Sequence, residues 1–383
     1  MTLIARLSDK LNKPFIPVCI TLILYIFFLV FLLQYKNKDI TSLITAGSQF
    51  TNKKELISRI DILSDSSGYD GQFFYRLALN PFTQKQKEYG ILLDTPFYRQ
   101  QRLLYPLMAS LISLGNPLVI PYAMVIVNII FLCILALYGC LYAQRRKKHA
   151  LWGLVFSLYA GFLFTLSRDL AEIISSGFFL AGLFYFDSKK FKLASLLFSL
   201  AVLTKETAMI LPLSICMVGI WERSIKKIVV GILPVVTYFI WHGWLIYNWK
   251  ENTTFGVQSN MDIPFRGIWL SIKIMPQQSI YLQNTYFLEL LFLFSISLLS
   301  FIYILRRKIN LYLITILILY SLLLVSLSLN VWREDYGFMR AFSEMFIVIF
   351  FILMRFKTKA VIVAGLISIS LWIYIGKGLL TLR

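Results

Sequence analysis

The segment GYDGQFFYRLALNPF, residues 68–82, places one acid, Asp70, between two glycines in an otherwise apolar chain. Glycine lets the backbone approach a substrate closely, and a carboxylate held there can act as a general base. Asp70 also stands where an N-cap would begin a helix over residues 71–79. Both functions are compatible, and we expect Asp70 to be catalytic. Three neighbours are expected to contact the substrate: Tyr69, Gln72 and Tyr75.

A second acidic pair, Asp169 and Glu172, occurs in the segment LSRDLAEI. The spacing of three residues predicts that both carboxylates share one helix face. The pair either starts a helix and forms a local ion pair with Arg168, or it faces Asp70 across a cleft, and the residues leave these alternatives open. In the second case Asp169 is a further catalytic acid. Asp70 and Asp169 could also ligate a divalent metal, although nothing in the sequence requires one.

Basic side chains near these acids are of the kinds that bind phosphate. Arginine presents a planar fork to phosphate oxygens, and lysine acts as a point charge. Lys205 and Glu206 stand between two apolar stretches, where an ion pair is costly unless it faces a cavity or a ligand. For the arginines, the alternative is anchoring at the membrane interface. The charged residues expected to contact the substrate are Arg99, Arg102, Arg168, Glu172, Lys205, Glu206, Arg333 and Arg340.

The chain that must position these residues is strongly apolar. Hydrophobic residues make up 58% of its 383 residues, the mean hydropathy is +0.72, and only 15% are charged, against about 25% in soluble domains. Long apolar runs recur from end to end. A helix needs about 20 apolar residues to cross the hydrocarbon core, and backbone groups cannot stay unpaired in lipid. The composition therefore predicts an all-α polytopic membrane protein.

The net charge of +19 does not indicate nucleic acid binding, because the basic residues punctuate the chain between apolar runs. This is the positive-inside pattern, which fixes topology. Placing the basic clusters in the cytoplasm leaves most acids on the outer side. The clusters are Arg145-Arg146-Lys147-Lys148, Lys189-Lys190-Lys192, Arg223-Lys226-Lys227, Arg306-Arg307-Lys308 and Arg355-Lys357-Lys359.

This topology predicts about eleven transmembrane helices. A first helix lies within residues 1–35, a structured extracytoplasmic loop covers 36–116, and the other spans lie within 117–383 with outer loops at 248–284 and 329–341. Residues 102–114 are too short to span, so we expect an interfacial helix there. The expected spans are 16–35, 118–143, 150–166, 170–186, 191–204, 207–221, 228–247, 285–304, 309–328, 342–354 and 360–376.

The order of these motifs resembles the GT-C glycosyltransferases, integral membrane enzymes that use polyprenyl-phosphate-linked sugars. GYDGQFFYRLALNPF is similar to the acid-aromatic motif of their first outer loop, and RQQRLLYP follows it as in bacterial members tied to cell-surface glycopolymers. LSRDLAEI and AVLTKETAMILP are similar to two later segments of the superfamily. The likeness covers about residues 16–215, and the last third matches in layout only.

The resemblance implies an inverting transfer of a sugar from a polyprenyl-phosphate carrier to a glycan, lipid or protein acceptor. Asp70 would be the base, Asp169 would assist, and Arg102, Lys205 and Arg340 would hold the carrier phosphate. Some members need a divalent metal and others do not. The implied location is a bacterial cytoplasmic membrane, with the site facing the periplasm or exterior. The alternatives are a non-catalytic relative, a transporter of lipid-linked sugars, and an O-antigen polymerase or ligase.

Overall fold

The computed structural model describes residues 10–36, 38–250, 260–306 and 309–381, and most of them are helical. Within these residues, five helices are long and apolar enough to cross a membrane, which supports an integral membrane protein as the composition predicts. They are α2 (Phe15–Tyr35), α6 (Ile120–Arg145), α12 (Ile225–Trp249), α14 (Ile280–Arg306) and α19 (Lys359–Thr381).

Other expected spans form shorter apolar helices. The longest of them, α9, has 16 residues and so extends ~24 Å at 1.5 Å per residue, less than the ~30 Å of a bilayer core. The count of eleven spans therefore stays a prediction. These helices are α9 (Glu172–Asp187), α10 (Phe191–Thr204), α11 (Ile210–Trp221), α15 (Leu311–Val325) and α18 (Ser343–Leu353).

The prediction of one continuous helix over 150–166 is wrong. The segment forms η3 (Ala150–Trp152), α7 (Gly153–Ser157) and α8 (Gly161–Leu166). The break between α7 and α8 contains Tyr159, whose buried hydroxyl donates to the Met339 carbonyl oxygen at 2.6 Å. This tertiary contact holds the chain in a conformation that apolar composition alone does not indicate.

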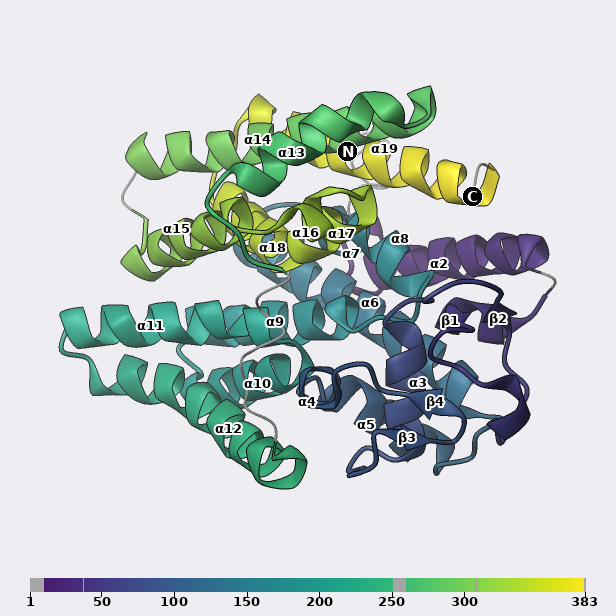
Figure 1. Ribbon diagram of the computed structural model, residues 1–383. Helices are drawn as coiled ribbons and strands as arrows, with labels where there is room; N and C mark the ends of the chain where they lie inside the picture. Colours follow the sequence, from purple (N-terminus) through teal and green to yellow (C-terminus); the bar gives the residue numbers. More distant parts are fainter. Residues whose placement is uncertain (1–9, 37, 251–259, 307–308, 382–383) are drawn as a thin grey trace.

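Residues 36–116, which we call the cap, fold into a compact unit of short elements gathered at one end of the helices (lower right in Figure 1). Strands β1 and β2 pair in parallel with Ala46 opposite Ile62, and β3 and β4 pair antiparallel. The elements are η1 (Ile40–Ile44), β1 (Ala46–Gly47), η2 (Lys53–Glu55), β2 (Ile62–Leu63), α3 (Gly71–Leu79), β3 (Lys87–Glu88), β4 (Ile91–Leu92), α4 (Pro96–Gln100) and α5 (Leu104–Ser113).

Helix α3 confirms the helix predicted over 71–79. Its first residue, Gly71, lies so close to other backbone that a Cβ there would be 2.4 Å from the Arg168 carbonyl oxygen. Gly68 has a φ of +67° in the left-handed region, which glycine adopts without strain. Gly71 therefore allows the cap to pack directly on the segment between α8 and α9, while Gly68 allows a tight turn against Thr45 and Gly47 within the cap.

Helix α5 occupies the segment for which an interfacial helix is predicted. Tyr105 and Ala109 are fully buried, and the helix packs on α6. Its other face exposes Leu111 and Ile112. An apolar outer face on a helix of ten residues fits a position at the membrane surface rather than across it.

The remaining segments that are expected on the outer side are folded where the structure describes them. Short helices η4 (Glu206–Met209), α13 (Arg266–Ile274), η6 (Met275–Gln277), α16 (Leu329–Trp332) and α17 (Asp335–Ala341) connect the longer ones. Met261 and Leu327 form an isolated antiparallel bridge, which joins the expected outer loop 248–284 to the end of the expected span 309–328. Residues 251–259 of the first loop lie outside the described residues.

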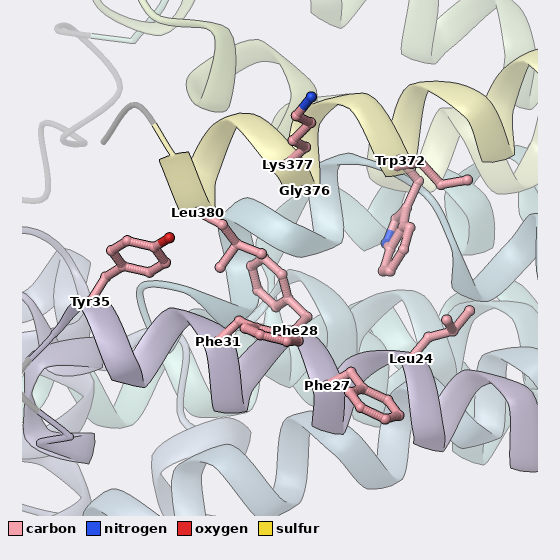
Figure 2. A pocket seen from close by; sticks show the side chains of 10 residues that line it. Leu24, Phe27, Phe28, Phe31, Tyr35, Trp372, Gly376, Lys377 and Leu380 are labelled. Carbon is pink, nitrogen blue, oxygen red and sulfur yellow. The ribbon is translucent and has the colours of Figure 1, made fainter.

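The first and last long helices, α2 and α19, lie side by side (Figure 1). The Trp372 indole donates to the Tyr25 hydroxyl at 3.1 Å across this contact. Beside it an apolar groove of about 410 Å³ runs between the two helices, with Phe28 and Leu380 meeting inside it (Figure 2). The groove ends near Tyr35, the last residue of α2 before the cap.

Candidate functional site

Asp70 lies at the centre of a charged cluster. Its Oδ1 accepts from Arg99 Nη1 at 2.6 Å, while its Oδ2 lies 3.6 Å from Arg340 Nη2 and 3.9 Å from Arg102 Nη1. In the described part of the chain its carboxylate makes no capping hydrogen bond to α3. The capping function expected for Asp70 is therefore wrong, because three guanidinium groups attract the carboxylate away from the helix.

The environment of Asp70 keeps it ionised. Burial by itself would raise the pKa of this carboxyl, but the charges of Arg99, Arg340 and Arg102 outweigh burial and hold the pKa at about 2. Its side chain keeps 24% of its surface exposed. A carboxylate with so low a pKa is a weak base as it stands, and it gains basicity only when an arginine is drawn away.

Arg340 connects Asp70 to a second acid. Its Nη2 donates to Glu172 Oε1 at 2.7 Å, and its Nη1 hydrogen-bonds the Tyr69 hydroxyl. Glu172 is the first residue of α9 and only 3% of its side chain is exposed. Lys205 Nζ lies 3.9 Å from the same Glu172 oxygen. The network thus joins the cap, α9 and α17 around buried charges.

Contrary to the expected ion pair, Lys205 and Glu206 contact different partners. Lys205 Nζ lies 3.4 Å from Glu344 Oε2, a fully buried acid of α18. Glu206 instead receives two hydrogen bonds from Arg102, at 3.0 and 2.7 Å. The extended backbone of Lys205, with φ −156° and ψ 127°, turns the neighbouring side chains to different partners.

Asp169 separates from Glu172, contrary to the predicted shared helix face. Helix α9 begins only at Glu172, and Asp169 precedes it with a left-handed φ of +49°. Asp169 is fully buried, and its two oxygens have no hydrogen-bond partner among the described residues. Burial raises the pKa of this carboxyl well above its usual range, so Asp169 differs from the ionised Asp70.

Two residues expected at the substrate instead hold the cap together. Gln72 Oε1 accepts from the Gly47 amide and the Thr51 hydroxyl, each at 3.1 Å. Tyr75 is buried and its hydroxyl lies 2.6 Å from Ser58 Oγ. Both side chains are satisfied inside the cap, away from the charges around Asp70.

Arg168 and Arg333 line a separate pocket of about 280 Å³ beside this network. The Arg168 guanidinium lies 4.2 Å from the Tyr336 ring centre and 5.6 Å from that of Tyr69. Tyr69 and Tyr336 themselves meet edge to face at 5.6 Å. The aromatic rings therefore separate this pocket from Asp70 while keeping it adjacent.

Two acids of the network were not anticipated from the sequence. Asp94 Oδ2 lies 2.7 Å from Arg99 Nη2 and so positions the arginine that holds Asp70. Glu344 accepts from Ser175 and Thr207 as well as from Lys205. The sequence could have indicated Glu344, because a charged residue inside the apolar run FSEMFIVIFFIL is energetically costly unless it has a partner or a function.

These residues form one unit, which we call the Asp70 cluster: Asp70, Asp94, Arg99, Arg102, Glu172, Lys205, Glu206, Arg340 and Glu344. Four basic side chains face five acidic ones, a formal net charge of −1. Each guanidinium already holds a carboxylate, so the cluster is nearly balanced. A phosphate group would enter it by exchange with a carboxylate rather than by filling an uncompensated positive site.

The arrangement does not fit the pair of metal ligands considered from the sequence. Both Asp70 oxygens face guanidinium groups, which would repel a dication, and Asp169 is buried elsewhere. The described residues also contain no group of three or more His, Cys, Asp or Glu side chains that could hold a metal ion. We therefore derive no step through a metal.

Comparison of the chain with protein-family models, with curated proteins and with solved structures gave no match. Function is accordingly inferred from the Asp70 cluster and from the motifs that carry its residues.

Proposed function

We propose that the chain is a membrane glycosyltransferase that moves a sugar from a polyprenyl-phosphate carrier to an acceptor hydroxyl on a glycan, lipid or protein. The observation that carries the proposal is the convergence of Asp70, Arg102, Glu172, Lys205 and Arg340 from five separate segments into one ion network. Asp70, Arg102, Glu172 and Lys205 come from motifs that resemble the GT-C superfamily, while Arg340 lies in the last third of the chain, where the likeness is one of layout. A structural ion pair would not need contributions from so many segments.

The three arginines contact Asp70 in different ways. Arg99 holds Asp70 through a hydrogen bond of 2.6 Å and is itself fixed by Asp94. The contacts of Asp70 with Arg340 and Arg102, at 3.6 and 3.9 Å, are too long for hydrogen bonds. These two guanidiniums can turn to the carrier phosphate without breaking a hydrogen bond to Asp70.

This exchange activates the base. When the phosphate takes the positive charge of Arg340 and Arg102, Asp70 loses two of the three charges that, with Arg99, keep its pKa at about 2, and its pKa rises. Asp70 then accepts the proton of the acceptor hydroxyl as that oxygen bonds to the anomeric carbon. The bond from the anomeric carbon to the phosphate oxygen breaks, and the arginines stabilise the departing phosphate.

The apolar groove between α2 and α19 supplies a place for the carrier chain (Figure 2). It ends at Tyr35, and the next residue, Lys36, enters the cap. A polyprenyl chain in the groove would thus bring its phosphate toward the basic residues beside the Asp70 cluster.

The proposal is tested by Asp70→Asn in vesicles that contain the purified chain, a polyprenyl-phosphate sugar and candidate acceptors. Loss of the base should lower transfer about 100-fold or more. Glu222→Gln is the matched control, because this exposed acid pairs with Lys227 outside the cluster. Transfer by Asp70→Asn at the wild-type rate would overturn the assignment of the base.

A further inference from the structure

A second carboxylate, Asp187, is also surrounded by three arginines. Its oxygens lie 2.8 Å from Arg146 Nη2, 3.1 Å from Arg355 Nη2 and 3.8 Å from Arg145 Nη1. These four residues, which we call the Asp187 cluster, come from the ends of α6 and α9 and the segment after α18. Their formal net charge is +2.

One carboxylate cannot occupy the donors of three guanidinium groups, each of which carries five N–H bonds. Arg145 also donates to Ser188 and Arg355 to Tyr142. Arg146 Nε is buried without a hydrogen-bond partner among the described residues. The arginine side chains are 16–35% exposed, so donors remain within reach of an outside anion.

The position of the Asp187 cluster indicates which anion could reach its arginines. Helix α9 starts at Glu172 in the Asp70 cluster and ends at Asp187, about 22 Å away at 1.5 Å per residue. The Asp187 cluster therefore lies at the far end of α9 from the Asp70 cluster, and long arginine side chains can extend to the headgroups from a helix that is shorter than the ~30 Å of a bilayer core. Nearby, Lys148 Nζ lies 4.8 Å from the centre of the Trp152 ring. Lysine and tryptophan are both common at the depth of the lipid headgroups.

A general attraction of basic loops to membranes does not explain this arrangement. The turn between α11 and α12 is also basic, yet its Arg223 and Lys226 are exposed on a single turn. The Asp187 cluster differs because its arginines converge on one carboxylate from two segments that are far apart in the sequence, the end of α6 and the segment after α18. Convergent guanidiniums bind phosphate oxygens through paired hydrogen bonds.

We propose that the Asp187 cluster binds the phosphate headgroup of an anionic phospholipid, in the leaflet opposite Asp70. Asp187 holds the arginines in place and competes with the phosphate for them. The site is separate from the proposed transfer site and does not depend on that activity. A free phosphate ion shares the same chemistry, so the test must distinguish the two sources.

The full chain, purified in a neutral detergent, is mixed with phosphatidylglycerol and phosphatidylcholine, and bound lipid is counted by native mass spectrometry. The wild type should retain phosphatidylglycerol preferentially. Arg146→Gln with Arg355→Gln should weaken this retention about tenfold or more. Arg223→Gln with Lys226→Gln removes the same charge from the α11–α12 turn and should retain the lipid.

Asp187→Asn removes the competing carboxylate and should strengthen retention, a gain that a misfolded variant cannot give. Equal losses in the two double variants would overturn the proposal, because only general charge would then matter. Displacement of the lipid by millimolar inorganic phosphate, with sodium chloride at equal ionic strength as control, would also overturn it. The site would then be one for a soluble anion.

Discussion

The Asp70 cluster and the Asp187 cluster are built alike, each from three arginines around one aspartate, yet their surroundings differ. Around Asp70, further carboxylates such as Asp94, Glu172 and Glu206 hold every guanidinium. Around Asp187, the described residues supply one carboxylate for all three arginines. The first cluster is nearly neutral and largely buried, while the second is positive and partly exposed.

The difference shows that the cost of removing one charged side chain depends on the burial and charge balance of its cluster. In a balanced and buried network, removing one member leaves an opposite charge without a partner, which is costly. In an exposed cluster with excess positive charge, water and ions take the place of a missing member. Substitutions should therefore act strongly near Asp70 and weakly near Asp187.

The largest effect is expected for Arg340→Met. It removes the hydrogen-bonded partner of Glu172 and leaves that buried acid with Lys205 at 3.9 Å. The free energy of unfolding, measured with denaturant in detergent micelles, should fall by about 3–5 kcal/mol. Arg340→Lys keeps the charge and should recover part of the loss. A decrease below about 1 kcal/mol would contradict the reading of the cluster as a buried network.

The pH dependence of stability is the next effect. The pKa of Asp70 in the folded chain is about 2, below the ordinary ~3.9 of an unfolded aspartate. Its ion pairs therefore stabilise the fold above the unfolded pKa, and this stability is lost as the pH falls through about 2. Between pH 5 and pH 2 the wild type should lose roughly 2 kcal/mol more than Asp70→Asn. Identical slopes for the two proteins would contradict the low pKa.

A smaller effect is expected for Tyr69→Phe, which removes the hydroxyl that hydrogen-bonds the Arg340 guanidinium. A hydrogen bond to a charged group contributes about 1.5–3 kcal/mol, and exposure at this half-buried ring favours the lower end. The free energy of unfolding is the measurement. Tyr247→Phe is the control, because Tyr247 is 81% exposed. An equal effect of both substitutions would contradict a stabilising hydrogen bond between Tyr69 and Arg340.

The smallest effect is expected for Arg145→Gln in the Asp187 cluster. Arg145 is 35% exposed and its contact with Asp187 is 3.8 Å long. The free energy of unfolding should therefore fall by less than about 1 kcal/mol. A loss as large as that of Arg340→Met would break the comparison, since the two clusters would then respond alike.

The sequence predicted what depends on local pattern. The glycines and the proline around residues 71–79 defined α3, and the apolar runs located the five long helices. Partners that tertiary packing brings together were harder to predict. Glu206 stands next to Lys205 but pairs with Arg102, 104 residues away, and the left-handed turn at Asp169 separates it from Glu172. Neither outcome is encoded in the spacing of those residues.

The contact between α2 and α19 has a consequence for biogenesis. Tyr25 and Trp372 are 347 residues apart in the chain, so during synthesis the first helix is made long before its neighbour exists. Arg340, which joins Asp70 to Glu172, is likewise translated long after both of these acids. The Asp70 cluster can therefore close only after the segment that carries Arg340 has been made. A chain that stops before residue 340 lacks both the arginine that joins Asp70 to Glu172 and the helix α19 that completes the apolar groove.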